Sequence, residues 1–146
     1  MLYFKDGRFH KCGASFMIPD GFYFDPTPDE GLEGFSAWAP NKKLHMELGI
    51  EESRADAKAD MEDYFEKGSD LDFQVRSSMI TTVVNGLRGY QASYVSNGAA
   101  FIEYRLELPE KALLWMTISE KASSIQAIMD SEYLTAILAE IGKTVQ

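Results

Sequence analysis

Residues 81–119 read TTVVNGLRGY QASYVSNGAA FIEYRLELPE KALLWMTIS, and this stretch decides the fold. Two Asn-Gly pairs, Asn85-Gly86 and Asn97-Gly98, each separate runs that are rich in β-branched and aromatic residues. Asn-Gly supplies the two positive φ angles of a type I′ turn, so each pair predicts a β-hairpin with a two-residue loop. Pro109 pre-sets a further turn, and together the turns predict a four-stranded antiparallel meander over about 72–84, 87–96, 99–108 and 112–119.

The same turns fix how the strands of the meander pair. Counting outward from Asn97-Gly98 places Tyr90 opposite Arg105, and counting outward from the Pro109 turn places Trp115 on the other side of that arginine. One face of the meander therefore carries the side chains of Tyr90, Tyr94, Phe101, Glu103, Arg105 and Trp115. The opposite face pairs apolar residues, such as Leu106 with Leu114, and is the predicted core face.

Elements on both sides of the meander complete the predicted fold. A weaker Asp-Gly signal at residues 6–7 predicts an N-terminal hairpin, and alternation over 43–51 predicts a half-buried strand. Apolar residues recur at helical spacing over 55–67 and over 124–142, so each segment is expected to form one amphipathic helix. The prediction is a single α+β domain over residues 1–146, in which two helices flank an antiparallel sheet.

Composition narrows the classes of function. The 146 residues are 45% hydrophobic and 25% charged, which is typical of one ordinary globular domain. Acidic residues outnumber basic residues 23 to 14, and the resulting net charge of −9 opposes binding to nucleic acid or anionic lipid. The single cysteine, Cys12, cannot form an internal disulfide, and no early apolar run suits a signal peptide or a membrane span. A cytoplasmic protein is expected, unless a leader has been removed.

A resemblance to a known family rests on the N-terminal side of the chain. Residues 16–22 read FMIPDGF, a strand that ends in Ile18-Pro19-Asp20-Gly21-Phe22, and strands, a helix, the meander and a second helix follow. This order resembles the PsbP-like family, which includes the photosystem II extrinsic protein, the Ran-binding import factor Mog one and many small bacterial proteins of unassigned function. The resemblance implies an α-β-α sandwich that docks to protein partners without catalysis, and it implies no catalytic residues.

The meander face around Arg105 is the predicted binding site. Aromatic residues beside an arginine are typical of the centres of protein interfaces, where they contribute much contact area at little entropic cost. The predicted site consists of Tyr90, Tyr94, Glu103, Arg105 and Trp115. Two alternatives stay open: the 55–67 helix covers this face, or its charges form ordinary cross-strand pairs.

The sequence predicts neither a metal site nor a catalytic site. His10 with Cys12, and His45 with Glu47, point the same way on their strands, but a zinc site needs three or four ligands. No Gly-x-Ser-x-Gly elbow, Gly-rich phosphate loop or His-Glu-x-x-His motif occurs. We therefore expect no cofactor and no enzymatic activity.

The predicted function is a non-catalytic protein-binding or adaptor module. A small secretion-associated chaperone or immunity-type protein is one alternative, and a small-molecule carrier with an enclosed apolar pocket is another. A homodimer is also an open alternative, because four aromatic residues lie near a Pro-rich loop over 25–31 and would form an interface if exposed: Phe22, Tyr23, Phe24 and Trp38. If they pack together, they form a satellite core instead.

Overall fold

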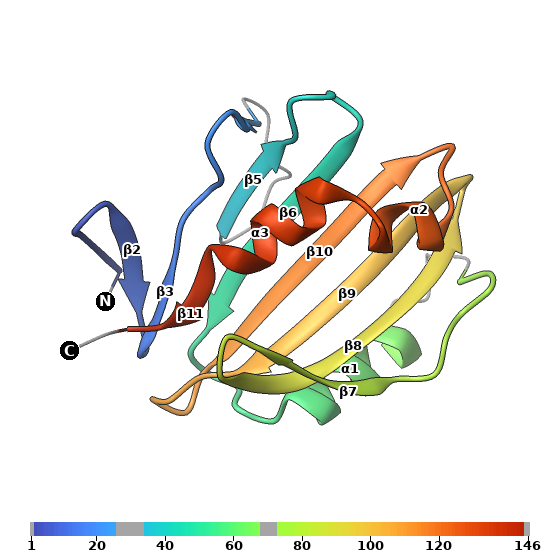
Figure 1. Ribbon diagram of the computed structural model, residues 1–146. Coiled ribbons are helices and arrows are strands. Elements are labelled where there is room, and N and C mark those ends of the chain that lie inside the picture. Colours follow the sequence, from blue (N-terminus) through green and yellow to red (C-terminus); the bar gives the residue numbers. More distant parts are fainter. Residues whose placement is uncertain (1, 26–33, 68–72, 145–146) are drawn as a thin grey trace.

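The structure is a computed structural model that describes residues 2–25, 34–67 and 73–144 (Figure 1). Its elements are β1 (Tyr3–Lys5), β2 (Arg8–Lys11), β3 (Ala14–Phe16), β4 (Tyr23–Phe24), β5 (Gly34–Trp38), β6 (Leu44–Glu51), α1 (Ala57–Lys67), β7 (Ile80–Val84), β8 (Leu87–Ser96), β9 (Ala99–Glu107), β10 (Leu113–Lys121), α2 (Ile125–Met129), α3 (Glu132–Ala139) and β11 (Ile141–Lys143). The strands form a seven-stranded sheet in the order β4-β5-β6-β10-β9-β8-β7 and a four-stranded sheet in the order β1-β2-β3-β11. Both sheets are antiparallel, so the α+β class is confirmed.

Helices lie on both faces of the larger sheet (Figure 1). α1 packs against β8 and β9 on one face, while α2 and α3 lie on the opposite face. This arrangement gives the predicted order of helix, sheet and helix. The predicted N-terminal hairpin forms as β1 and β2, but it belongs to the separate four-stranded sheet. No helix among the described residues is both long enough and apolar enough to cross a membrane.

The meander forms with the predicted turns and register. Asn85 and Asn97 have φ of 48° and 50°, and the glycines after them have φ of 87° and 77°, as a type I′ turn requires. Tyr90 and Trp115 both pair with Arg105, as counting from the turns predicts.

The first strand of the meander is shorter than predicted. β7 begins at Ile80, whereas the sequence predicts a strand from about residue 72, which lies outside the described residues. Gln74 still makes an isolated bridge to Val95, but Val75 has φ of 46°, which takes the chain out of the extended conformation. All of the predicted 25–31 loop except Asp25 also lies outside the described residues.

The C-terminal prediction of one helix over 124–142 is wrong. The segment forms α2, α3 and β11, so the described chain has three helices rather than two. Ser131 interrupts the helical path with ψ of 134°, and its hydroxyl accepts a hydrogen bond from the N–H of Tyr133 as the N-cap of α3. Gly142 lies in β11 and pairs with Ser15, so it does not end a helix. The apolar spacing continues across the break, which is why the sequence pattern suggests one stripe.

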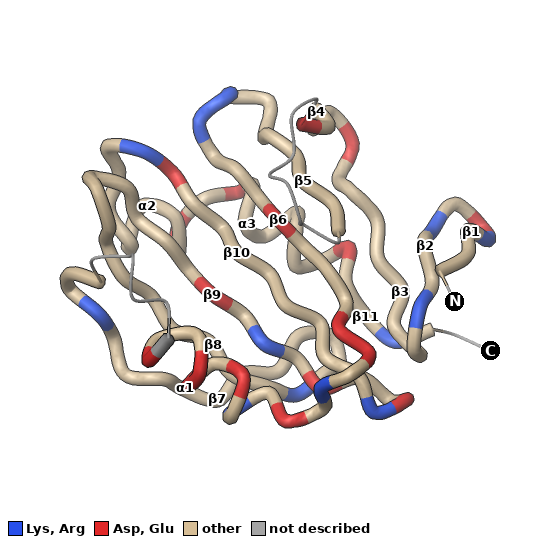
Figure 2. The backbone as a smooth tube through the Cα atoms, turned by 180° about the vertical axis from the view of Figure 1, so that it is seen from behind, with Lys and Arg blue, Asp and Glu red and all other residues tan. Residues whose placement is uncertain are grey.

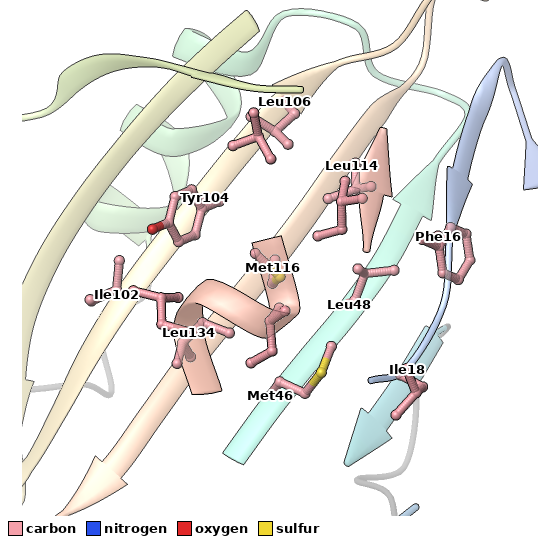
Figure 3. Close-up of a cluster of buried hydrophobic side chains, with 14 of the residues drawn as sticks. Phe16, Ile18, Met46, Leu48, Ile102, Tyr104, Leu106, Leu114, Met116 and Leu134 are labelled. Carbon is pink, nitrogen blue, oxygen red and sulfur yellow. The ribbon is translucent and has the colours of Figure 1, made fainter. Parts of the chain in front are cut away.

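The main core lies between the larger sheet and the C-terminal helices (Figure 3). Strand residues such as Met46, Ile102 and Met116 are almost fully buried there, and Leu134 and Ile137 of α3 pack against them. Burying each of these side chains stabilises the fold by about 1.5–3 kcal/mol. A second, smaller core consists of Met61, Phe65, Ala92 and Tyr94, between α1 and the opposite face of the sheet.

Candidate functional site

The face of the larger sheet on which α1 packs, here called the α1 face, carries three rows of side chains that cross the strands. The aromatic row consists of Tyr23, Trp38, His45, Ser119, Phe101 and Tyr94. The polar row consists of Ser36, Glu47, Thr117, Glu103 and Ala92. The arginine row consists of Gly34, Gly49, Trp115, Arg105, Tyr90 and Thr81. The structure thus places all five predicted site residues on one face.

α1 covers the end of the α1 face that lies over β8 and β9. Glu103 has no exposed surface, and Tyr94 and Arg105 retain 1% and 5%. These three predicted site residues offer no accessible surface to a partner, so the expectation of a docking centre around Arg105 is corrected. The alternative in which the helix covers this face is what the structure shows. Tyr90 and Trp115, the other two predicted residues, are half-buried.

The buried charges at this end form a complete hydrogen-bond network. Glu103 accepts hydrogen bonds from the Tyr94 hydroxyl at 2.9 Å, from Arg105 Nη1 at 3.0 Å and from Thr117 Oγ1 at 2.7 Å. Arg105 Nε donates to Asp60 Oδ2 of α1 at 2.8 Å. Two of these donors also contact α1, Tyr94 through the hydroxyl of Tyr64 and Arg105 through Asp60, so the buried carboxylate belongs to the network that holds the helix on the sheet.

The network shifts the pKa values of its members. Burial alone would lower the pKa of Arg105, but the neighbouring carboxylates of Glu103 and Asp60 raise it above its ordinary value, so the guanidinium stays charged. Burial and the negative charge of Glu103 raise the pKa of Tyr64 to about 12. The same two causes raise the pKa of Tyr94, whose hydroxyl lies 2.7 Å from that of Tyr64. Both tyrosines are therefore neutral donors at neutral pH.

The other half of the α1 face lies over β5, β6 and β10. In Figure 2, which views the molecule from this side, α1 lies at the β7 and β8 end of the sheet, away from β5 and β6. The side chains here are half-buried rather than covered, and we call this set the open half: Trp38, His45, Glu47, Trp115, Thr117 and Ser119. A hollow of about 300 Å³ lies along it. Its lining combines aromatic, acidic and basic side chains: Trp38, Phe101, His45, Asp25, Glu47, Glu120, Lys43 and Lys121, with Ala99 and Ser119.

His45 is the centre of the polar groups in this hollow. Its Nε2 lies 2.7 Å from Ser36 Oγ and 3.2 Å from Asp25 Oδ2, and its Nδ1 lies 3.8 Å from Glu47 Oε1. The Trp38 ring lies 4.4 Å from the His45 ring, centroid to centroid. His45 therefore lies among two carboxylates, one hydroxyl and one aromatic ring.

These groups do not form the arrangement of a catalytic triad. A triad needs the hydroxyl and the carboxylate on opposite nitrogens of the imidazole. Here the hydroxyl of Ser36 and the nearer carboxylate, that of Asp25, share Nε2, and Glu47 lies 3.8 Å from Nδ1, which is beyond hydrogen-bond distance. Ser36 also lies in the middle of β5, where the backbone is paired with β6.

Sequence reasoning found only part of this hollow. Alternation along β6 places His45 and Glu47 on the same side of their strand, as expected. Asp25 and Ser36 come from other segments, and no local sequence spacing predicts that they lie beside His45. Within residues 2–25, 34–67 and 73–144, no group of three or more His, Cys, Asp and Glu side chains is placed to hold a metal ion.

Comparisons with known proteins give the fold and no activity. No family model matches the chain, and no curated protein matches it. A crystal structure from Bacteroides thetaiotaomicron VPI-5482 is similar to 92% of this chain, with a TM-score of 0.53 and 8% sequence identity. The chain spans 46% of the length of that protein. At this identity the likeness shows a shared α+β fold alone.

Proposed function

We propose that this protein is a non-catalytic binding module that takes a positively charged protein segment on the open half of the α1 face. The observation that carries the proposal is the position of the two tryptophans of the chain, Trp38 and Trp115. Both are half-buried on this one face, and Trp38 lines a hollow that is also lined by Asp25 and Glu47. Tryptophan is enriched at the energetic centres of interfaces, and its ring attracts cations.

Charge supports a basic segment as the occupant. The chain has a net charge of −9, which speeds the encounter with a cationic partner and slows the encounter with an acidic one. Trp38 and Phe101 line the hollow with aromatic rings, and its acidic residues, Asp25, Glu47 and Glu120, outnumber its lysines, Lys43 and Lys121. An arginine side chain fits this set, because it can lie against a ring and donate to a carboxylate at the same time.

In this proposal the Arg105 network has a supporting role. It fixes α1 over one end of the sheet through Asp60, and Trp115 lies at the border between the covered and the open parts of the face. Docking to a partner without catalysis is also what the PsbP-like resemblance implies, and that membership stays a prediction. A secretion-associated chaperone or an immunity-type protein would be a special case of such a module.

The carrier alternative finds no support in the described part of the chain. A carrier needs an enclosed apolar pocket between the sheet and a helix. The space between the larger sheet and α3 is filled by side chains such as Ile102, Met116 and Ile137, each at most 1% exposed. The hollow on the open half is lined by charged and aromatic residues together, and it does not lie between the sheet and a C-terminal helix.

A selection from a displayed library of random peptides tests the proposal. Peptides that bind the intact chain should be enriched in arginine or lysine, and Trp38→Ala should weaken their binding roughly 30-fold, since a central interface tryptophan contributes about 2 kcal/mol or more. Glu47→Gln should weaken the binding of these peptides as well. Phe4→Ala, which removes an exposed aromatic ring from the smaller sheet, is the matched control and should have no effect. Selected peptides without basic residues, or peptides that bind the Trp38→Ala variant equally well, would contradict the proposal.

A further inference from the structure

β7 is an outer strand of the seven-stranded sheet, with β8 on its inner side. Its sequence is Ile80-Thr81-Thr82-Val83-Val84, five β-branched residues without a charge or a proline. Ile80 and Val83 are 54% and 64% exposed, which is high for apolar side chains. Soluble proteins usually protect an outer strand with charges, prolines, bulges or a very short length, because its unpaired backbone groups can pair with another chain.

The other outer strands of the two sheets carry such protection. β4 has two residues and runs directly into Asp25. β1 has three residues, of which Lys5 is charged, and β11 also has three and ends in Lys143. β7 is longer than each of them and lacks a charge. Among the described strands it is therefore the one best suited to pair with another strand.

The hairpin register defines which backbone groups of β7 point outward. Because Val84 and Leu87 flank a two-residue turn, they form a hydrogen-bonded pair, and hydrogen-bonded pairs then alternate along the ladder. Val84, Thr82 and Ile80 direct their N–H and C=O groups to β8. Thr81 and Val83 direct theirs away from the sheet, at the unpaired side of β7.

We propose that β7 pairs antiparallel with β7 of a second copy of this chain, with Thr82 on the two-fold axis. This register pairs Thr81 with Val83 of the other copy on both sides of the axis, so all four outward N–H and C=O groups of each strand are used. Every cross-strand pair is then β-branched against β-branched, which is a favourable combination.

The sequence of β7 favours a second copy as the occupant, because the strand is self-complementary about Thr82 and carries no charge. A chain with a net charge of −9 repels its own copies, so self-association is expected only where the meeting surfaces are uncharged. β7 meets this condition, and so do the residues at its ends, Ser77, Ser78 and Met79 before it and Asn85 and Gly86 after it. The interface is short, so we expect a weak dimer whose population rises with concentration.

Sedimentation equilibrium over a range of concentrations tests the pairing. The average mass should rise from 16.4 kDa toward twice that value, and Val83→Lys should weaken the association by about tenfold or more, since a lysine on an outer strand opposes pairing. Phe4→Lys, which places the same charge on the exposed face of β1, is the control and should leave the dimer intact. Val83 is exposed, so circular dichroism should show the variant folded. A mass that stays monomeric at every concentration, or a dimer that tolerates Val83→Lys, would overturn the proposal.

A cross-link tests the register independently. Across the two-fold axis the Thr82 pair is not hydrogen-bonded, so its Cα atoms should be about 4.5 Å apart, a separation that a disulfide bridges. In a Cys12→Ser background, Thr82→Cys should form a disulfide-linked dimer on mild oxidation much faster than Phe4→Cys. Equal rates for the two variants would contradict the register.

Discussion

Arg105 Nε donates a hydrogen bond to Asp60 Oδ2 at 2.8 Å, and this contact joins the middle of β9 to α1. The same guanidinium contacts Glu103, which has no exposed surface, at 3.0 Å. One side chain therefore both neutralises a buried carboxylate and fixes the helix that covers it. Because α1 is held at the β8 and β9 end, it leaves the β5 and β6 end of the α1 face uncovered (Figure 2).

Replacing Arg105 by methionine should destabilise the fold strongly. Removing one partner of a buried ion pair leaves the other charge uncompensated, which costs about 3–5 kcal/mol. Urea unfolding measures the loss, and the double variant Arg105→Met with Glu103→Gln should recover much of it. Lys11→Met is the control, because Lys11 and Glu52 lie 4.0 Å apart with 24% and 61% of their side chains exposed, and such pairs contribute at most about 1 kcal/mol. Equal losses from the Arg105 and Lys11 variants would refute the structural role of Arg105.

Stability should fall steeply at alkaline pH. Burial raises the pKa of Tyr104 to about 12, and burial together with Glu103 raises the pKa of Tyr94. Above about pH 10 the unfolded chain releases phenol protons that the native chain retains, so the free energy of unfolding decreases as pH rises. The expected slope is about 1.4 kcal/mol per pH unit for each of these tyrosines. Urea unfolding between about pH 10 and pH 12 measures how the free energy of unfolding falls with pH. Tyr104→Phe should make this fall less steep by the contribution of one tyrosine, and an unchanged slope would count against this account.

The two Asn-Gly turns should respond differently to the same substitution. Asn85 Nδ2 donates to the carbonyl of Leu138 at 2.9 Å and to that of Ile141 at 2.6 Å, so the first turn also anchors the end of α3. Glycine suits the positive φ at both turns, so Asn85→Gly loses mainly these two hydrogen bonds. We expect Asn85→Gly to be about 1–3 kcal/mol less stable than Asn97→Gly in thermal or urea unfolding. Equal stabilities would show that the anchor contributes nothing.

The Cys12 thiol should alkylate slowly. Burial raises its pKa, and the carboxylate of Glu52, whose Oε1 lies 3.6 Å from the sulfur, raises it further. Glu52→Gln should therefore speed the reaction with iodoacetamide below that pKa, because more thiolate is present. Lys11 acts in the opposite direction, so Lys11→Met should slow the reaction. The mechanism fails if both variants change the rate in the same direction.

The turns and the register of the meander could be predicted from the sequence, because they depend on residues that are neighbours in the chain. An Asn-Gly pair needs no distant residue to form its turn, and the turns carry the register of the whole meander, including the positions of Tyr90 and Trp115 beside Arg105. The helix break at Ser131 is harder to predict, because the apolar stripe continues through it and only the cap geometry reveals it.

The candidate site depends on contacts between distant segments, which periodicity does not encode. Arg105 pairs with Asp60, 45 positions away, and this contact turns a predicted surface into a covered one. His45 meets Asp25 and Ser36, which lie 20 and 9 positions away on other segments. None of these residues indicates a site when it is considered alone in the sequence, so the hollow can be identified only from the folded structure.

The indole N–H signals in a ¹⁵N–¹H spectrum test the central claim most directly. The chain has two tryptophans, and both lie on the α1 face, so each signal reports on that face. On addition of a selected basic peptide, the Trp38 signal should shift strongly and the Trp115 signal should shift to a smaller extent. A peptide that binds while both indole signals stay in place would show that the open half is not the docking site.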